Sequence, residues 1–158
     1  MDELFLPASI IMGIVTFSLI ARWYIIPALA KTSLSQALIP LLLIHCFRYI
    51  GLAFLIPGVT SQPLDLRFAN PAAYGDLLAG VLALLAVIAL KCNWKIAIPA
   101  VWIFNVFGTL DLFNALFQGF RHTSSGHMGA TYFIPTVAVP ALLVTHYLIF
   151  QILLEEKT

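Results

Sequence analysis

Residues 37–57 read ALIPLLLIHCFRYIGLAFLIP, an apolar run that contains one histidine and one arginine, His45 and Arg48. About 20 predominantly apolar residues make a helix long enough to cross the hydrocarbon core of a bilayer. Pro40 falls in the first turn, where a proline is tolerated because the first amide groups of a helix have no partner. This stretch therefore predicts a transmembrane helix that carries a charge near its middle.

The whole chain has the composition of a membrane protein. Of its 158 residues, 61% are hydrophobic and only 9% are charged, whereas soluble domains have about 25% charged residues. Its mean hydropathy is +1.00. A soluble domain of this composition would have no polar surface, so we expect membrane lipids as its surroundings. A formal net charge of +1 argues against nucleic acid as a partner.

Apolar segments divided by polar connections predict an all-α integral membrane protein with five transmembrane helices in a single membrane domain, residues 1–158. Each segment must be helical because backbone exposed to lipid has to satisfy its own hydrogen bonds. We expect the first segment to be retained, because the charges that precede it, Asp2 and Glu3, are acidic. The expected helices are residues 4–29, 37–57, 75–92, 96–118 and 130–154, with outer loops at 58–74 and 119–129.

Basic residues are unevenly distributed between the two ends of this bundle. One end has Arg67 and Arg121, and the end that holds the C-terminus has more. By the positive-inside rule that second end is cytoplasmic and the N-terminus lies outside. We expect a multi-pass protein of the plasma membrane, which in a bacterium is the inner membrane. The basic residues of the second end are Arg22, Lys31, Lys91, Lys95 and Lys157.

An intramembrane polar patch is expected on the second helix. On an α-helix His45, Arg48 and Tyr49 share one face, which should look into the bundle because a guanidinium in lipid is costly. Asp111 of the fourth helix is the expected counter-charge of Arg48, since a hydrogen-bonded pair removes most of the burial penalty. Asn114 and Tyr49 would satisfy the remaining polar atoms.

Two further polar residues complete the expected pocket. Asn105 lies on a face of the fourth helix about 120° from Asp111. His146, on a fifth helix that Pro135 and Pro140 should kink or open, lies at the same expected depth as His45. Either neighbouring groups satisfy the two histidines, or both ligate a b-type haem.

Other polar residues are expected near the membrane surface. Asp76 and Lys91, at the two ends of the third helix, should reach outward. A stripe of small residues on that helix predicts close packing against a neighbour. In the outer loop, His122 and His127 are weak candidates for a metal site, together with Asp65 or Asp76. The stripe consists of Gly75, Ala79, Ala83, Ala86 and Ala89.

These features favour a small membrane protein whose central pocket binds or transports a small ligand or a proton. The alternatives are a membrane enzyme for an apolar substrate, a haem protein that uses His45 and His146, and a scaffold without chemistry. In the enzyme, His45 and Asp111 would transfer protons, Arg48 would hold a charge, and Trp102 and Phe107 would cover the substrate. Because five helices rarely enclose a whole path, we expect a homo-oligomer or a subunit of a membrane complex.

Overall fold

The computed structural model describes residues 2–123 and 125–155, and in these ranges it is all-helical. Five of its helices are long and apolar enough to cross a membrane, which agrees with the expected multi-pass architecture. The first comprises α1 (Asp2–Ile20), η1 (Ala21–Ile25) and α2 (Ile26–Leu29), and the second comprises α3 (Leu34–His45) and η2 (Cys46–Leu55). The third is α4 (Leu66–Lys91), and the fourth is α5 (Ala97–His122). The fifth comprises η4 (Gly129–Tyr132), η5 (Ile134–Ala138) and α6 (Val139–Glu155), and a short turn, η3 (Ser125–His127), precedes it.

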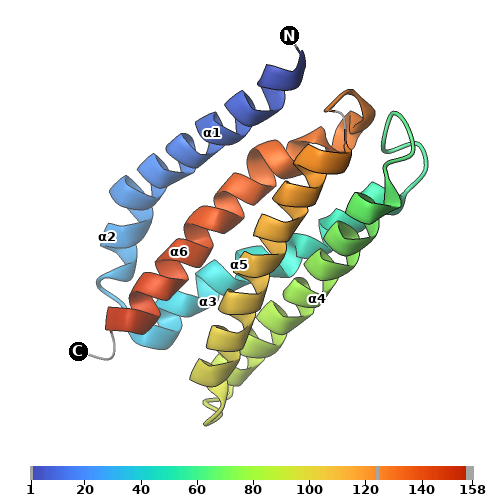
Figure 1. Ribbon diagram of the computed structural model, residues 1–158. Coiled ribbons are helices and arrows are strands. Elements are labelled where there is room, and N and C mark those ends of the chain that lie inside the picture. The colour runs from blue at the N-terminus through green and yellow to red at the C-terminus, as the bar shows by residue number, and fades with distance from the viewer. Residues whose placement is uncertain (1, 124, 156–158) are drawn as a thin grey trace.

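The helices form one bundle with two distinct ends (Figure 1). The short-turn end holds the connections 30–33 and 92–96, and the long-loop end holds the connection 56–65 and the short turn η3. Helix α4 packs against both α5 and η2, and α6 packs against α3 and α5. Helix α1 lies at the edge of the bundle, where it contacts α6 and η5.

Helix α4 begins at Leu66, so the expectation of a loop through residue 74 was wrong. The Asp65 side chain caps the helix by accepting a hydrogen bond from the Arg67 backbone N–H at 2.8 Å. In the extra turns Phe68 and Ala69 are buried against Phe54. Burial of this apolar surface stabilises the first turns of α4. The polar residues around these turns had suggested a loop.

The other helix limits differ less from expectation. The second helix starts at Leu34 behind a Ser33 capping box, earlier than the expected residue 37. Helix α5 continues to His122, four residues beyond the expected 118. The outer connections are therefore shorter than the loops predicted at 58–74 and 119–129.

The second helix changes from α-helical to 3-10 geometry at Cys46 and stays so to Leu55. A 3-10 helix has 3.0 residues per turn, so every third side chain faces the same way. The buried residues follow that spacing as His45, Arg48, Gly51 and Phe54. Tyr49 is consequently turned outward and is 52% exposed, so its expected place in the inward patch was wrong.

Two predictions about packing are confirmed. Four residues of the small-residue stripe on α4, Ala79, Ala83, Ala86 and Ala89, are almost completely buried. The fifth helix is locally opened, because the π-helical turn η5 precedes Pro140, which has no backbone N–H to donate. At this point α1 approaches closely, and a Cβ added to Gly13 would lie 2.7 Å from the Thr136 carbonyl oxygen.

Candidate functional site

Arg48 is the centre of a polar cluster inside the bundle. The residue is only 1% exposed, although arginine is rarely buried so fully. Its Nε donates to Asp76 Oδ1 at 2.7 Å and its Nη2 donates to Asp111 Oδ2 at 2.6 Å. Its Nη1 donates to the Gly108 carbonyl oxygen at 3.1 Å. The expected pair of Arg48 and Asp111 is therefore present, within a larger network.

Asp76 is the residue of this network that sequence reasoning misplaced. It was expected to reach toward the surface, but its side chain is only 10% exposed and is bound to Arg48. The error follows from the helix start, because a helix that begins at Leu66 carries Asp76 about 15 Å into the bundle. The Asp65 cap was the sequence signal that could have corrected it.

The cluster contains more negative than positive formal charge. One guanidinium faces two carboxylates at 2.7 and 2.6 Å, so the three ionised groups sum to −1. No other ion pair with these three residues occurs in the described part of the chain. A charge without a counter-charge is costly in an apolar interior. The unbalanced negative charge is therefore the feature of this site that needs an explanation.

His146 and Asn105 form the side of the cluster that α5 and α6 share. The Asn105 amide donates to the His146 carbonyl oxygen at 3.2 Å, and Asn105 Oδ1 lies 2.6 Å from His146 Nδ1. Because an amide oxygen can only accept, His146 Nδ1 carries the hydrogen. His146 Nε2 is then an acceptor and faces Arg48 Nη1 at 3.4 Å. Asn105 thus fixes a neutral tautomer that points its lone pair at the guanidinium.

His45 lies beside His146, with the two ring centroids 4.1 Å apart. Thr145 Oγ1 donates to the carbonyl oxygens of Ala141 and Leu142 at 3.0 Å, so His45 Nε2 donates to that hydroxyl at 2.9 Å. The remaining ring nitrogen, His45 Nδ1, is buried and has no hydrogen-bond partner among the described residues.

The histidine pair does not fit axial ligation of a haem. Such ligation places the flat macrocycle between the two imidazoles. The His45 and His146 rings are in direct contact, and their Nε2 atoms face Thr145 and Arg48. The two histidines, correctly expected at one depth, are therefore held by neighbouring polar groups.

Three glycines allow the helices to close around the cluster. A Cβ on Gly51 would clash with Asp76 Oδ2, and a Cβ on Gly75 would clash with Asp111 Oδ1. A Cβ on Gly108 would lie 2.7 Å from His146 Cε1. The helices that face Asp76, Asp111 and His146 thus each have a glycine at the contact, and any larger residue would displace that side chain.

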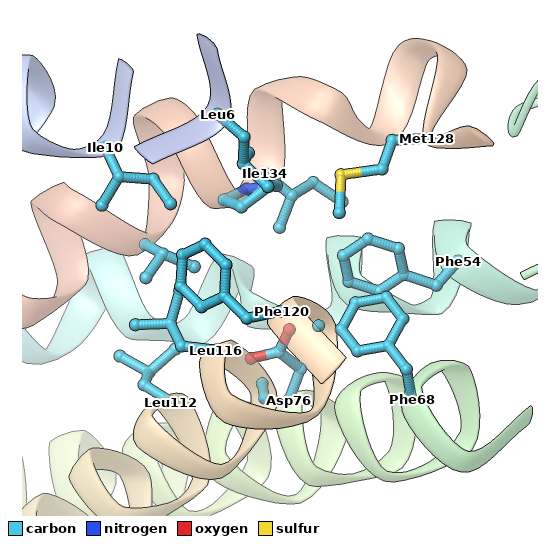
Figure 2. Close-up of a pocket in the computed structure, with 14 residues that line it drawn as sticks. Leu6, Ile10, Phe54, Phe68, Asp76, Leu112, Leu116, Phe120, Met128 and Ile134 are labelled. Atoms are coloured by element: carbon cyan, nitrogen blue, oxygen red, sulfur yellow. The ribbon is translucent and has the colours of Figure 1, made fainter. Parts of the chain in front are cut away.

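A small cavity reaches the cluster from the long-loop half of the bundle. It measures about 30 Å³, and Asp76 is its only charged lining residue. Figure 2 shows the Asp76 carboxylate beside the cavity, with the rings of Phe54, Phe68 and Phe120 around it. Asp76 Oδ2 has no hydrogen-bond partner in the described part of the chain, since Arg48 binds Oδ1. The cavity therefore leads to the Asp76 carboxylate.

Other predicted site residues lie outside the cluster. Asn114 is exposed on α5, so it does not complete the pair of Arg48 and Asp111 as expected. His127 is exposed in the outer connection. Residues 2–123 and 125–155 contain no group of three or more histidine, cysteine, aspartate or glutamate residues arranged to hold a metal ion. His122 and His127 are therefore not gathered into such a group with Asp65 or Asp76.

The sequence comparisons identify a family without assigning a function. A family model described as a domain of unknown function, DUF8737, matches residues 5–154. Neither a curated protein nor a solved structure matches the chain. Because the family match spans almost all of the five-helix bundle, the chain belongs to the DUF8737 family.

Proposed function

We propose that the protein is a membrane transport protein in which Asp76 and Asp111 share one exchangeable proton beside Arg48. The observation that carries this proposal is the pairing of one buried guanidinium with two carboxylates. A single proton on the carboxylate pair brings the formal charge of the cluster to zero. Ionisable residues at membrane depth commonly mark proton or ion pathways.

All groups that face the cluster support a single proton-binding event. Helix η2 contributes Arg48, α4 contributes Asp76, α5 contributes Asp111, and α6 contributes His146. His146 is held neutral by Asn105, so it adds no charge, and His45 adjoins the cluster through its ring contact with His146. The proton is therefore assigned to the two carboxylates, and Asp76 is the carboxylate that exchanges it because Asp76 lines the cavity.

The helix irregularities near the cluster support a transport role. Arg48 lies in the 3-10 segment η2, and the π-helical turn η5 contributes Ile134 and Pro135 to the cavity wall. Interrupted helices commonly form the substrate and ion sites of secondary transporters. We assign the short-turn end to the cytoplasm by the positive-inside rule, so the cavity opens from the outer side.

Infrared spectroscopy of the purified protein in lipid tests this proposal. At neutral pH the wild type should have a protonated carboxyl C=O band that shifts in D₂O. The Asp76→Asn and Asp111→Asn variants should each lose it, because one carboxylate balances Arg48 without a proton. Asp65→Asn, at the exposed cap of α4, is the matched control and should keep the band. A wild type without the band, or both site variants with it, would contradict the proposal.

Transport itself requires a second measurement. Vesicles that contain the protein and a trapped pH-sensitive dye should collapse an imposed pH gradient faster than empty vesicles. The Asp76→Asn protein should behave as empty vesicles do, and the Asp65→Asn control should match the wild type. If the pH gradient collapses equally fast with the wild type and with Asp76→Asn, the cluster takes no part in transport.

A further inference from the structure

The cavity above Asp76 combines one carboxylate with an apolar and partly aromatic lining. Asp76 is more than nine-tenths buried, and its Oδ2 is a hydrogen-bond acceptor without a partner in the described chain. The remaining lining is apolar and includes three phenylalanines and one methionine: Phe54, Phe68, Phe120 and Met128. The rings of Phe54 and Phe68 meet edge to face at 5.1 Å between centroids. An occupant is thus offered one anionic oxygen and several aromatic rings (Figure 2).

Metal cations do not suit this lining. Ca²⁺ takes six to eight oxygen ligands and Mg²⁺ prefers six, but the cavity lining provides one carboxylate group. An ammonium group needs fewer oxygen ligands than these metal ions. One of its N–H groups donates to a carboxylate, and aromatic rings stabilise the rest of the cation. The size is also restrictive, because a cavity of about 30 Å³ admits only a small occupant.

We propose that this cavity binds ammonium or a short primary alkylammonium ion such as methylammonium in exchange for the shared proton. The inference rests on the proposed proton site and names the ligand that competes for it. The N–H of the cation donates to Asp76 Oδ2, and the methyl group of methylammonium contacts the phenylalanine rings. The cluster keeps Arg48 paired with Asp76 and Asp111 throughout.

The exchange is balanced in charge and in atoms. With the proton bound, the guanidinium, the two carboxyl groups and the proton sum to zero. The proton leaves to bulk water as one alkylammonium cation enters, and the sum remains zero. No covalent bond to carbon or nitrogen changes, and one proton is released for each cation bound. Because proton and cation compete for one charge, the apparent affinity for the cation should fall about tenfold for each pH unit of acidification.

Proton release on cation addition tests the exchange. Detergent-purified protein in a weakly buffered solution with an indicator dye is titrated with methylammonium chloride, and with tetraethylammonium chloride and sodium chloride as controls. Methylammonium should release one proton per chain and remove the infrared band of the protonated carboxyl group. Tetraethylammonium is too large for the cavity, so it should release none. Asp65→Asn should respond as the wild type does.

A second variant distinguishes a loss of binding from a loss of folding. Phe120→Leu keeps Asp76 and the infrared band but removes one ring from the cavity, so it should weaken methylammonium binding about two- to fivefold. A wild type that keeps its infrared band and releases no proton with methylammonium would overturn the exchange and leave the proton site standing. Equal release by sodium or by tetraethylammonium would also overturn it. Absence of the band in the wild type would overturn the proposed function and the exchange together.

Discussion

Replacing Arg48 by glutamine should destabilise the protein strongly, and the loss should depend on pH. The change removes the cation from two buried carboxylates and a donor from the Gly108 carbonyl oxygen. Breaking a buried ion pair by removing one partner costs about 3–5 kcal/mol. Arg22→Gln is the matched control, because Arg22 is exposed and surface changes usually stay within about 0.5 kcal/mol.

The pH dependence follows from the number of bound protons. In the proposed site the folded wild type holds one proton on Asp76 and Asp111, whereas folded Arg48→Gln should hold two because no guanidinium remains. Above about pH 4 the unfolded chains have both carboxyls ionised, so each proton in the folded state makes stability fall by about 1.4 kcal/mol per pH unit as the pH rises. The variant holds one proton more. Its deficit relative to the wild type should therefore shrink by about 2.8 kcal/mol between pH 7 and pH 5.

Unfolding of both proteins in bicelles, followed by circular dichroism at pH 7 and pH 5, measures this difference. The expected deficit is about 3–5 kcal/mol at pH 7 and about 0–2 kcal/mol at pH 5. A deficit at pH 7 no larger than that of Arg22→Gln would show that Arg48 is not the counter-charge. A large deficit that does not change with pH would refute the assignment of a shared proton.

Three further predictions concern the surroundings of the cluster. Gly51→Ala should lower the stability measured by thermal unfolding by about 1–3 kcal/mol. Gly80→Ala is the control and should be tolerated, because its Cβ would lie 3.5 Å from its nearest neighbour. Equal effects of the two substitutions would contradict the tight contact at Gly51. Asn105→Leu should cost about 1–3 kcal/mol and release the fixed tautomer of His146, so ¹⁵N NMR should lose the signature of a hydrogen on Nδ1 that the wild type is expected to have. The pKa of Asp65 is lowered from 3.8 to about 2, chiefly by hydrogen bonds from the neighbouring arginine. This stabilisation of the α4 cap should be complete above about pH 4 and disappear as the pH falls through about 2, and an NMR titration in which Asp65 behaves as an ordinary carboxyl would contradict it.

The sequence was sufficient for those features that depend on composition and charge. Long apolar runs predict five membrane-length helices because lipid requires them, and a buried Arg48 demands an acidic partner such as Asp111. The small-residue stripe on α4 likewise predicts close packing, which the buried Ala79 and Ala83 confirm.

Features that depend on tertiary contacts could not be predicted from composition and charge. The segment η2 packs against α4 in 3-10 geometry, which turns Tyr49 outward while Gly51 faces Asp76. If η2 is assumed to be α-helical, the repeat of 3.6 residues per turn therefore places Tyr49 on the inward face, which is wrong. Asp76 was missed because polar residues near Asp65 suggested a loop, although they cap a helix whose apolar turn packs on Phe54.

The most direct measurement of the shared proton uses the small number of aspartates in the chain. Only Asp2, Asp65, Asp76 and Asp111 would carry a ¹³C label at the side-chain carboxyl carbon. Asn substitutions assign the signals of Asp76 and Asp111, and NMR in lipid at pH 7 reports their protonation. The proposed site predicts one proton on this pair, with Asp65 ionised as an internal reference. Fully ionised signals for both Asp76 and Asp111 at pH 7 would contradict it.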